Sequence, residues 1–164
     1  MISHVQMQEA VLRMVAAVLI GCVVGLDRNL HGKPTGVKTL GLVALGSCLV
    51  TMAGSAFVLS GSADNTNAGR VIQGVITGIG FLGAGVIVQH GSERKISGLT
   101  TAASIWVTAA LGIVCGIGAW EIAAISTVLL LLLLSVGGRI EKALHRRWLS
   151  KSPEEQAAIA RHEE

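Results

Sequence analysis

Charged side chains are scarce in this 164-residue chain, and their scarcity defines its class. Only 14% of the residues are Asp, Glu, Lys or Arg, whereas soluble domains carry roughly a quarter. Tyrosine is absent and proline occurs twice, so the 21 glycines form neither a collagen repeat nor a Pro/Gly-rich linker. Four stretches hold no charged residue: 39–63, 71–92, 96–120 and 122–138. A bilayer core about 30 Å thick needs about 20 apolar residues per helix, so we predict a membrane protein.

Cysteine is also rare, and its placement argues against a disulfide framework. Cys22, Cys48 and Cys115 all lie in apolar stretches, without a C-x-x-C motif. We expect them to be small packing residues. The chain also offers no Cys–His, Ser–His–Asp or paired-carboxylate arrangement, so we do not expect an enzyme.

The apolar stretches predict an all-α bundle of five transmembrane helices. A first span, interrupted only by Arg13, has neither a basic segment before it nor a cleavage-site pattern after it, so it is predicted to be a retained helix rather than a signal peptide. The five spans are expected near 9–26, 39–59, 71–90, 99–117 and 119–137. Residues 1–138 would form one membrane domain, and 139–164 a short, partly helical tail.

Lys and Arg predict the orientation of the bundle. Only Arg13 and Arg70 lie outside loop 27–38, loop 91–98 and the tail, which together hold 11 of the 13 basic residues. Five spans place these three groups on one side, which the positive-inside rule assigns to the cytoplasm, with the N-terminus outside. Arg70 and Arg13 are expected to reach the outer surface, with a pair to Glu9 as the alternative for Arg13. The net charge of +3 then reflects topology, and no nucleic-acid partner is expected.

The third span contains a pattern, Gly78-Ile-Gly80-Phe-Leu-Gly83, that matches the dinucleotide fingerprint G-x-G-x-x-G. That fold needs an acid about 20 residues later, and residues 98–105 contain none. A phosphate-binding turn also cannot lie exposed in lipid, so no nucleotide is expected at Gly78–Gly83. Two alternatives remain: the glycines let helices touch, or they bend or unwind this span as in transporter sites.

Small residues predict where helices approach one another closely. The first, third and fourth spans each carry G-x-x-x-G, and we expect them to form the packed centre, with the leucine-rich fifth span facing lipid. The predicted packing glycines are Gly21, Gly25, Gly74, Gly78, Gly80, Gly83, Gly85, Gly112 and Gly116.

Polar residues form two candidate functional groups. The first lies in GLDRNLHGKPTGVKT (25–39) and consists of Asp27, Arg28, His31, Lys33, Lys38 and Thr39. Its basic residues could be simple membrane anchors. Asp27 lies at the lipid boundary and needs a partner, for which Arg28, Lys38 and Thr39 are the candidates. Asp27 is also the only candidate metal ligand.

The second group is a polar face inside the membrane. Thr100, Ser104 and Thr108 recur every four residues and therefore share one side of a helix. They could hydrogen-bond within and between helices, or they could line a polar lane shared with the third span. The full set is Gln73, Thr77, Thr100, Thr101, Ser104 and Thr108.

Three segments together resemble the MgtC/SapB family: 25–39, GVITGIGFLGAGVIV (74–88) and GLTTAASIWVTAALGIVCG (98–116). The resemblance covers about 10–138. It implies a multi-pass protein of the bacterial inner membrane with a five-helix domain, linked to growth in low magnesium and to virulence. It also implies regulation of the F-type ATP synthase. Many members add a soluble C-terminal domain, which we do not expect in 139–164.

Two functions follow as hypotheses. The chain could be a regulator that contacts a membrane complex, helix against helix. Alternatively, it could be a homo-oligomeric carrier of Mg²⁺ or another cation, with Mg²⁺ as cargo or sensed ion rather than cofactor. Mg²⁺ prefers carboxylate and other oxygen ligands, and the spans of one chain offer Asp27 at one edge, Glu121 at the opposite edge and no acid between them. A carrier would therefore need an oligomer that gathers several Asp27 side chains.

Overall fold

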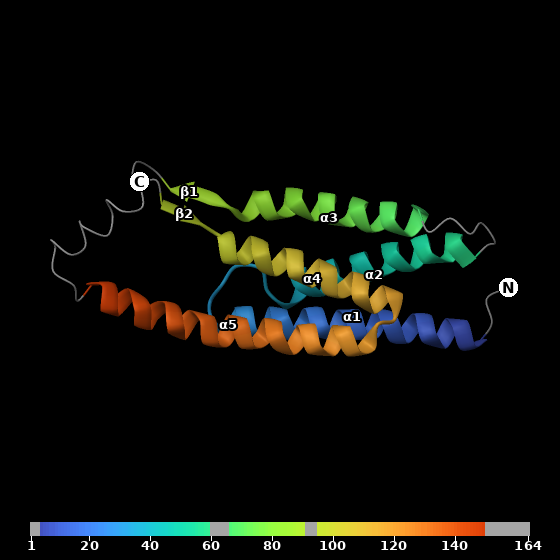
Figure 1. The fold of residues 1–164 in the computed structure, drawn as a ribbon, viewed down its shortest axis with the longest axis horizontal. Helices are drawn as coiled ribbons and strands as arrows, with labels where there is room; N and C mark the ends of the chain where they lie inside the picture. Colours follow the sequence, from blue (N-terminus) through green and yellow to red (C-terminus); the bar gives the residue numbers. More distant parts are fainter. Residues whose placement is uncertain (1–3, 60–65, 91–94, 150–164) are drawn as a thin grey trace. The chain divides into compact units, whose positions relative to one another are not determined.

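A computed structural model describes residues 4–59, 66–90 and 95–149 and contains, within them, five helices and two short strands (Figure 1). All five helices are long and apolar enough to cross a membrane, which confirms the predicted all-α, five-span class. The elements are α1 (His4–Leu30), α2 (Val37–Leu59), α3 (Thr66–Val86), β1 (Val88–His90), β2 (Lys95–Ser97), α4 (Leu99–Ile117) and α5 (Trp120–Leu149).

Helix α3 is continuous, and a β-hairpin follows it. The unwound alternative for this span is therefore wrong, and the helix ends at Val86 instead of near residue 90. Strands β1 and β2 pair antiparallel, with Val88 opposite Ser97. The hairpin was not predicted, because three-residue strands are too short to show an alternating pattern. The hairpin leads into Gly98, which must be glycine for two reasons. Its φ is 91°, and a Cβ added there would lie 2.1 Å from the Val86 carbonyl oxygen.

Helix α2 lies between α1 and α4 at backbone contact distance. On one side, a Cβ added at Gly21 of α1 would lie 2.5 Å from the Leu40 carbonyl oxygen. On the other side, a Cβ added at Gly112 of α4 would lie 2.3 Å from the Ala44 carbonyl oxygen. Gly25 and Gly116 make comparable approaches to α2 one turn further along their helices. Small residues therefore pack α2 from both sides, as in close helix pairs within lipid.

The packed centre consists of α1, α2 and α4, so the expectation of α1, α3 and α4 is wrong. Of residues 68–86 in α3, only Ile79 and Gly83 are buried, and α3 lies alongside α4 (Figure 1), with Gly83 next to Ala102. An added Cβ would meet nothing within 4 Å at four α3 glycines: Gly74, Gly78, Gly80 and Gly85. Their predicted role in packing can therefore concern only contacts outside the described chain.

Cysteines fill part of this centre. Cys48 and Cys115 are fully buried in one cluster with Ala17, Ala44 and Ala123. The Cys48 thiol lies 3.7 Å from the thioether of Met52. All three cysteines of the chain are free.

Arg13 was expected to reach the outer surface. In the structure its side chain lies against the end of α4. Its Nη1 donates to the Gly116 carbonyl oxygen at 2.7 Å, and its Nη2 pairs with Glu9, the alternative partner. Gly118, with φ of 85°, ends α4 and leaves room for the guanidinium. A cation at a helix C-terminus complements the helix dipole.

Beyond Thr127 the chain forms a second compact unit, whose described part is the remainder of α5. Three of its leucines, Leu129, Leu132 and Leu133, are more than half exposed. The helix continues past residue 138, so 139–149 of the predicted tail are helical. Residues 150–164 of the tail lie outside the described residues.

The two kinds of glycine can be compared by adding one methyl group to each. We expect Gly112→Ala to lower the free energy of unfolding by about 1–3 kcal/mol, because the methyl would overlap the α2 backbone. Gly78→Ala adds the same group into open space and should change stability by no more than about 0.5 kcal/mol. Reversible unfolding by SDS in mixed micelles measures both, and equal effects would contradict the packing described for α2.

Candidate functional site

Arg28, in the last turn of α1, is buried and joins three parts of the fold. Its side chain is only 2% exposed. Nη1 donates to Ser104 Oγ at 3.1 Å, and Nη2 donates to the Pro34 carbonyl oxygen at 3.2 Å and to Thr101 Oγ1. One guanidinium thus links α1, the following loop and the first turns of α4, so Arg28 is not a simple surface anchor.

The loop of residues 31–36 folds tightly over the end of α1. The amide of Lys33 donates back to the Arg28 carbonyl oxygen at 3.0 Å, around Gly32 with φ of 62°. Thr35 also has a positive φ, 67°, which is uncommon for a residue with a branched side chain. At the other end, Gly36 lies so close to Asn29 that an added Cβ would overlap its side-chain oxygen. These turns place the Pro34 carbonyl over the guanidinium.

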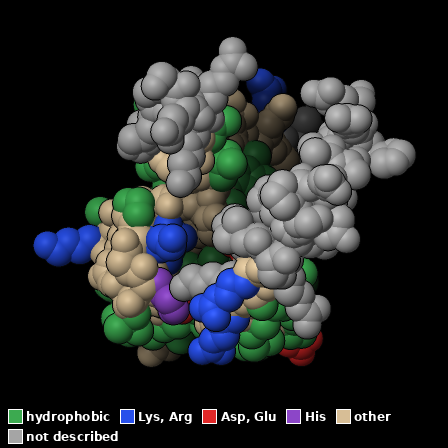
Figure 2. Space-filling view, turned by 90° about the vertical axis from the view of Figure 1, so that its left-hand side faces the viewer, with side chains coloured by type: hydrophobic (Ala, Val, Ile, Leu, Met, Phe, Trp, Pro, Cys, Tyr) green, Lys and Arg blue, Asp and Glu red, His purple; other side chains and the backbone are tan. Residues whose placement is uncertain are grey.

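Asp27 forms its ion pair with His31. Its Oδ1 lies 3.5 Å from His31 Nδ1, and the carboxylate side chain is 18% exposed. Within the described ranges it has no ion pair with Arg28 or Lys38, so the partner differs from the three candidates that the sequence suggested. Lys33, Lys38 and Thr39 are exposed. Figure 2 looks at the end of the molecule where α1 ends and shows Lys and Arg side chains with a histidine at the surface.

The guanidinium of Arg28 is held only by neutral oxygens. Among the described residues, no carboxylate lies within 4.0 Å of it. Its Nε is buried and donates to no acceptor in that part of the chain. A buried charge without a counter-ion is costly, so these neutral contacts are essential to the local fold.

Two hydroxyls of α4 donate hydrogen bonds to carbonyl oxygens of their own helix, and two accept hydrogen bonds from Arg28. Ser104 Oγ donates to the Thr100 carbonyl oxygen, and Thr108 Oγ1 to that of Ser104, both at 2.7 Å. This is the hydrogen bonding within and between helices that was one of the two alternatives.

The other alternative, a lane shared with α3, is not formed within one chain. Gln73 and Thr77 are exposed, whereas Thr101, Ser104 and Thr108 are buried. Thr77 Oγ1 donates to the carbonyl oxygen of Gln73 in its own helix, at 2.8 Å. The two polar groups therefore belong to different surfaces.

The described part of the chain holds no group of three His, Cys, Asp or Glu side chains that could bind a metal ion. Asp27, with His31 beside it, stays the only candidate ligand that the sequence suggested. What sequence reasoning missed is the burial of Arg28, because an arginine in a basic segment at a helix end is typical of an anchor.

A double-mutant cycle tests the Arg28–Thr101 contact. Thr101→Val should lower the free energy of unfolding by about 1–3 kcal/mol, because it removes an acceptor from a buried cation. In an Arg28→Met background most of that loss should vanish, since no charge is left to satisfy. Thr77→Val, which removes a hydroxyl bonded only within α3, is the control and should be additive with Arg28→Met. Additivity of Thr101→Val with Arg28→Met would contradict the contact.

Comparison with known proteins places this geometry in a family. The chain matches the MgtC family over residues 14–143. It is 44% identical to protein SrpB of Synechococcus elongatus over 147 residues, covering 85% of this chain and 79% of SrpB. It is 40% identical to YhiD of Escherichia coli K12, named a putative magnesium transporter, covering 78% of this chain and 60% of YhiD. No solved structure matches it.

The chain is also 35% identical to protein MgtC of Salmonella typhimurium LT2, covering 74% of this chain and 49% of that protein. It therefore spans most of SrpB but less than two thirds of YhiD and of MgtC. The family match extends over the helices that hold Asp27, Arg28 and the α4 hydroxyls. The resemblance seen in the sequence is thereby confirmed, and the chain belongs to the MgtC family.

Proposed function

We propose that this multi-pass membrane protein is a regulator in the bacterial inner membrane, linked to magnesium homeostasis, that acts by helix–helix contact with another membrane complex. The link to magnesium rests on the name of the relative YhiD and on the family resemblance. The mode of action rests on one observation, the open face of α3.

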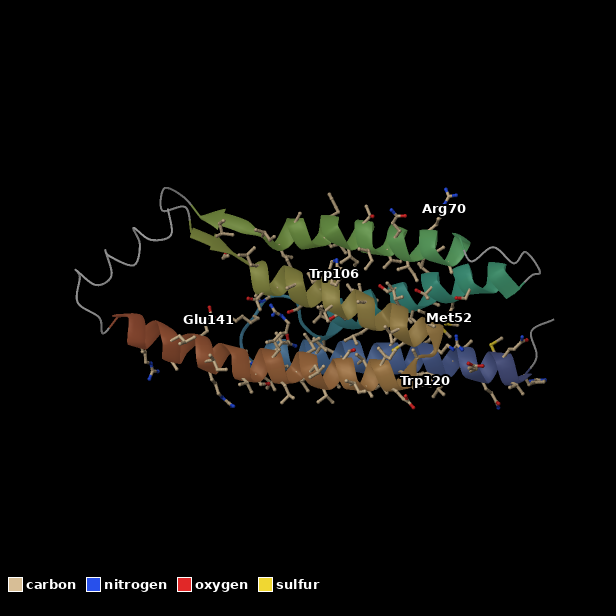
Figure 3. The ribbon with its side chains drawn as sticks, viewed as in Figure 1. Met52, Arg70, Trp106, Trp120 and Glu141 are labelled. Atoms are coloured by element: carbon tan, nitrogen blue, oxygen red, sulfur yellow. The ribbon has the colours of Figure 1, made fainter. Side chains whose placement is uncertain are left out.

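That face is rich in glycine, and its glycines make no contact with the other described residues. At Gly74 and Gly78 an added side chain would meet nothing within 4 Å, and Phe81, one turn on, is 81% exposed. Arg70 projects from α3 away from the other helices (Figure 3). Glycines four residues apart let a second helix approach at backbone distance, which α1 and α4 already do to α2.

A polar side chain on the same helix favours a protein partner over lipid. Gln73 is exposed within the span Ala68–Val86, and its amide makes no hydrogen bond to the described residues. An amide without a partner in hydrocarbon costs a few kcal/mol, whereas a neighbouring helix could satisfy it. The F-type ATP synthase, suggested by the family resemblance, is the partner we propose, and the effects on virulence would follow from it.

A cation carrier built from several copies is the second candidate. The name of YhiD and the partial exposure of Asp27 at the end of α1 favour it. Against it, the buried residues of α1, α2 and α4 include no acid, and α3 is not interrupted. We therefore prefer the regulator.

Transport can be measured directly. Purified protein in liposomes with an entrapped Mg²⁺ indicator should give no flux above that of empty liposomes, because one chain has no acidic path. Asp27→Asn, which keeps the size of the side chain, is the matched variant. A flux that Asp27→Asn abolishes would replace the regulator by the carrier.

Contact through α3 can be tested by photo-crosslinking in cells. A benzophenone amino acid at position 78 should crosslink to a membrane subunit of the ATP synthase at least about fivefold more than the same group at position 46, as expected for a specific interface. Gly46 of α2 is the control, because it is also open, with nothing within 4 Å of an added Cβ. Equal crosslinking at both positions would contradict the α3 interface, and adducts only with a second copy would point to self-association instead.

A further inference from the structure

We propose that Arg28 and the first turn of α4 form a binding site for a phosphate group, carried either by a lipid headgroup or by free phosphate. This site is independent of the α3 face and of the regulator proposed above. The site consists of the buried Arg28 guanidinium, the N-terminus of α4, and the loop whose Pro34 carbonyl a phosphate oxygen would replace.

The first argument is a buried guanidinium that makes no direct contact with a described carboxylate. Arg28 is 98% buried, and its three acceptors, on Pro34, Thr101 and Ser104, are all neutral. Its Nε has no acceptor in the described part of the chain, and no described carboxylate lies within 4.0 Å. A buried guanidinium is ordinarily paired with an anion, so the site has both a charge and a donor to spare.

The second argument is the helix end that the guanidinium faces. Helix α4 has 19 residues and begins at Leu99, and its N-cap, Gly98, offers no side chain to accept from the first-turn amides. This end carries the positive pole of the helix dipole, which attracts anions. Thr101 in this turn accepts from Arg28 and donates to no described acceptor, so its hydroxyl hydrogen is also available. The guanidinium thus bonds to side chains in the first turns of α4, and no described carboxylate lies within 4.0 Å of it.

The third argument is the route of entry. Arg28 is covered in this structure, so a phosphate oxygen must replace a present contact. The Pro34 carbonyl, at 3.2 Å from Nη2, is the contact that belongs to a loop instead of a helix. That loop contains the two positive φ angles at Gly32 and Thr35. Its movement would free Nη2 from this contact.

The surrounding charges favour a phosphate group at this end of the bundle. Lys33 lies in the loop and Lys38 in the first turn of α2, and both are exposed, so each adds a positive charge at this end of the bundle. Asp27 is the opposing charge, and His31 lies 3.5 Å from its carboxylate. Several donors in different directions suit the tetrahedral oxygens of phosphate, which guanidinium groups bind with two parallel hydrogen bonds.

The experiment is solid-state NMR on the full chain with ¹⁵N-labelled arginine, measuring the loss of ¹⁵N signal caused by nearby ³¹P. One sample holds the protein in phosphorus-free maltoside micelles with inorganic phosphate. The other holds it in phosphatidylglycerol bilayers without free phosphate. The Arg28 Nε signal is assigned by its absence from Arg28→Lys or, if that variant does not fold, by the slow hydrogen exchange of a buried guanidinium.

We expect ³¹P dephasing of the Arg28 Nε signal in at least one sample. Dephasing only in bilayers identifies a lipid headgroup, and dephasing only in micelles identifies free phosphate. In the sample that responds, Thr101→Val should weaken binding at least tenfold, measured by titrating phosphate or the anionic lipid, whereas Lys38→Gln should weaken it less than threefold. No dephasing in either sample, or equal losses in the two variants, would overturn the proposal and leave Arg28 with a structural role alone.

Discussion

Backbone contact across α2 is the constraint on which the rest of the structure depends. Glycines of α1 and of α4 bring both helices so close to α2 that a single added methyl group would overlap its carbonyl oxygens. In lipid, where apolar side chains gain little from leaving the solvent, such close packing is a main source of helix association. The contact also limits how far each helix can slide along its neighbour, because a bulkier residue moved to these positions would overlap the α2 backbone.

The polar contacts of α1 follow from that fixed register. Arg13 bonds to the carbonyl end of α4, and Arg28 bonds to hydroxyls in the first turns of the same helix. Helices α1 and α4 must therefore run in opposite directions, with their ends matched at both membrane surfaces. A shift of one helical turn, about 5.4 Å, would break both arginine contacts at once. The two cations thus make one register of the bundle more stable than its neighbours.

The sequence predicted the spans from their lack of charge, and it predicted Gly21, Gly25, Gly112 and Gly116 as glycines placed at helix contacts. The same G-x-x-x-G pattern in α3 meets none of the described helices, because the pattern shows that a helix can approach closely but not which helix does so. Arg28 shows the converse limit. The other basic residues of segment 27–38, Lys33 and Lys38, are exposed, whereas the hydroxyls of α4, 73 residues away at Thr101, make Arg28 a buried donor.

Two features of the chain, the glycine face of α3 and the buried Arg28, are not explained by the stability of the fold and are therefore the best candidates for function. Glycines of α1 and α4 pack closely against α2, yet a glycine-rich face and the Gln73 amide on α3 have no partner among the described residues. At the end of α1 it surrounds a cation with neutral oxygens instead of an anion. Both are costly in a bilayer unless something outside the chain completes them. Since stability alone would favour a leucine on α3 and an apolar residue at position 28, the physical argument for binding is stronger at these two places than at Asp27.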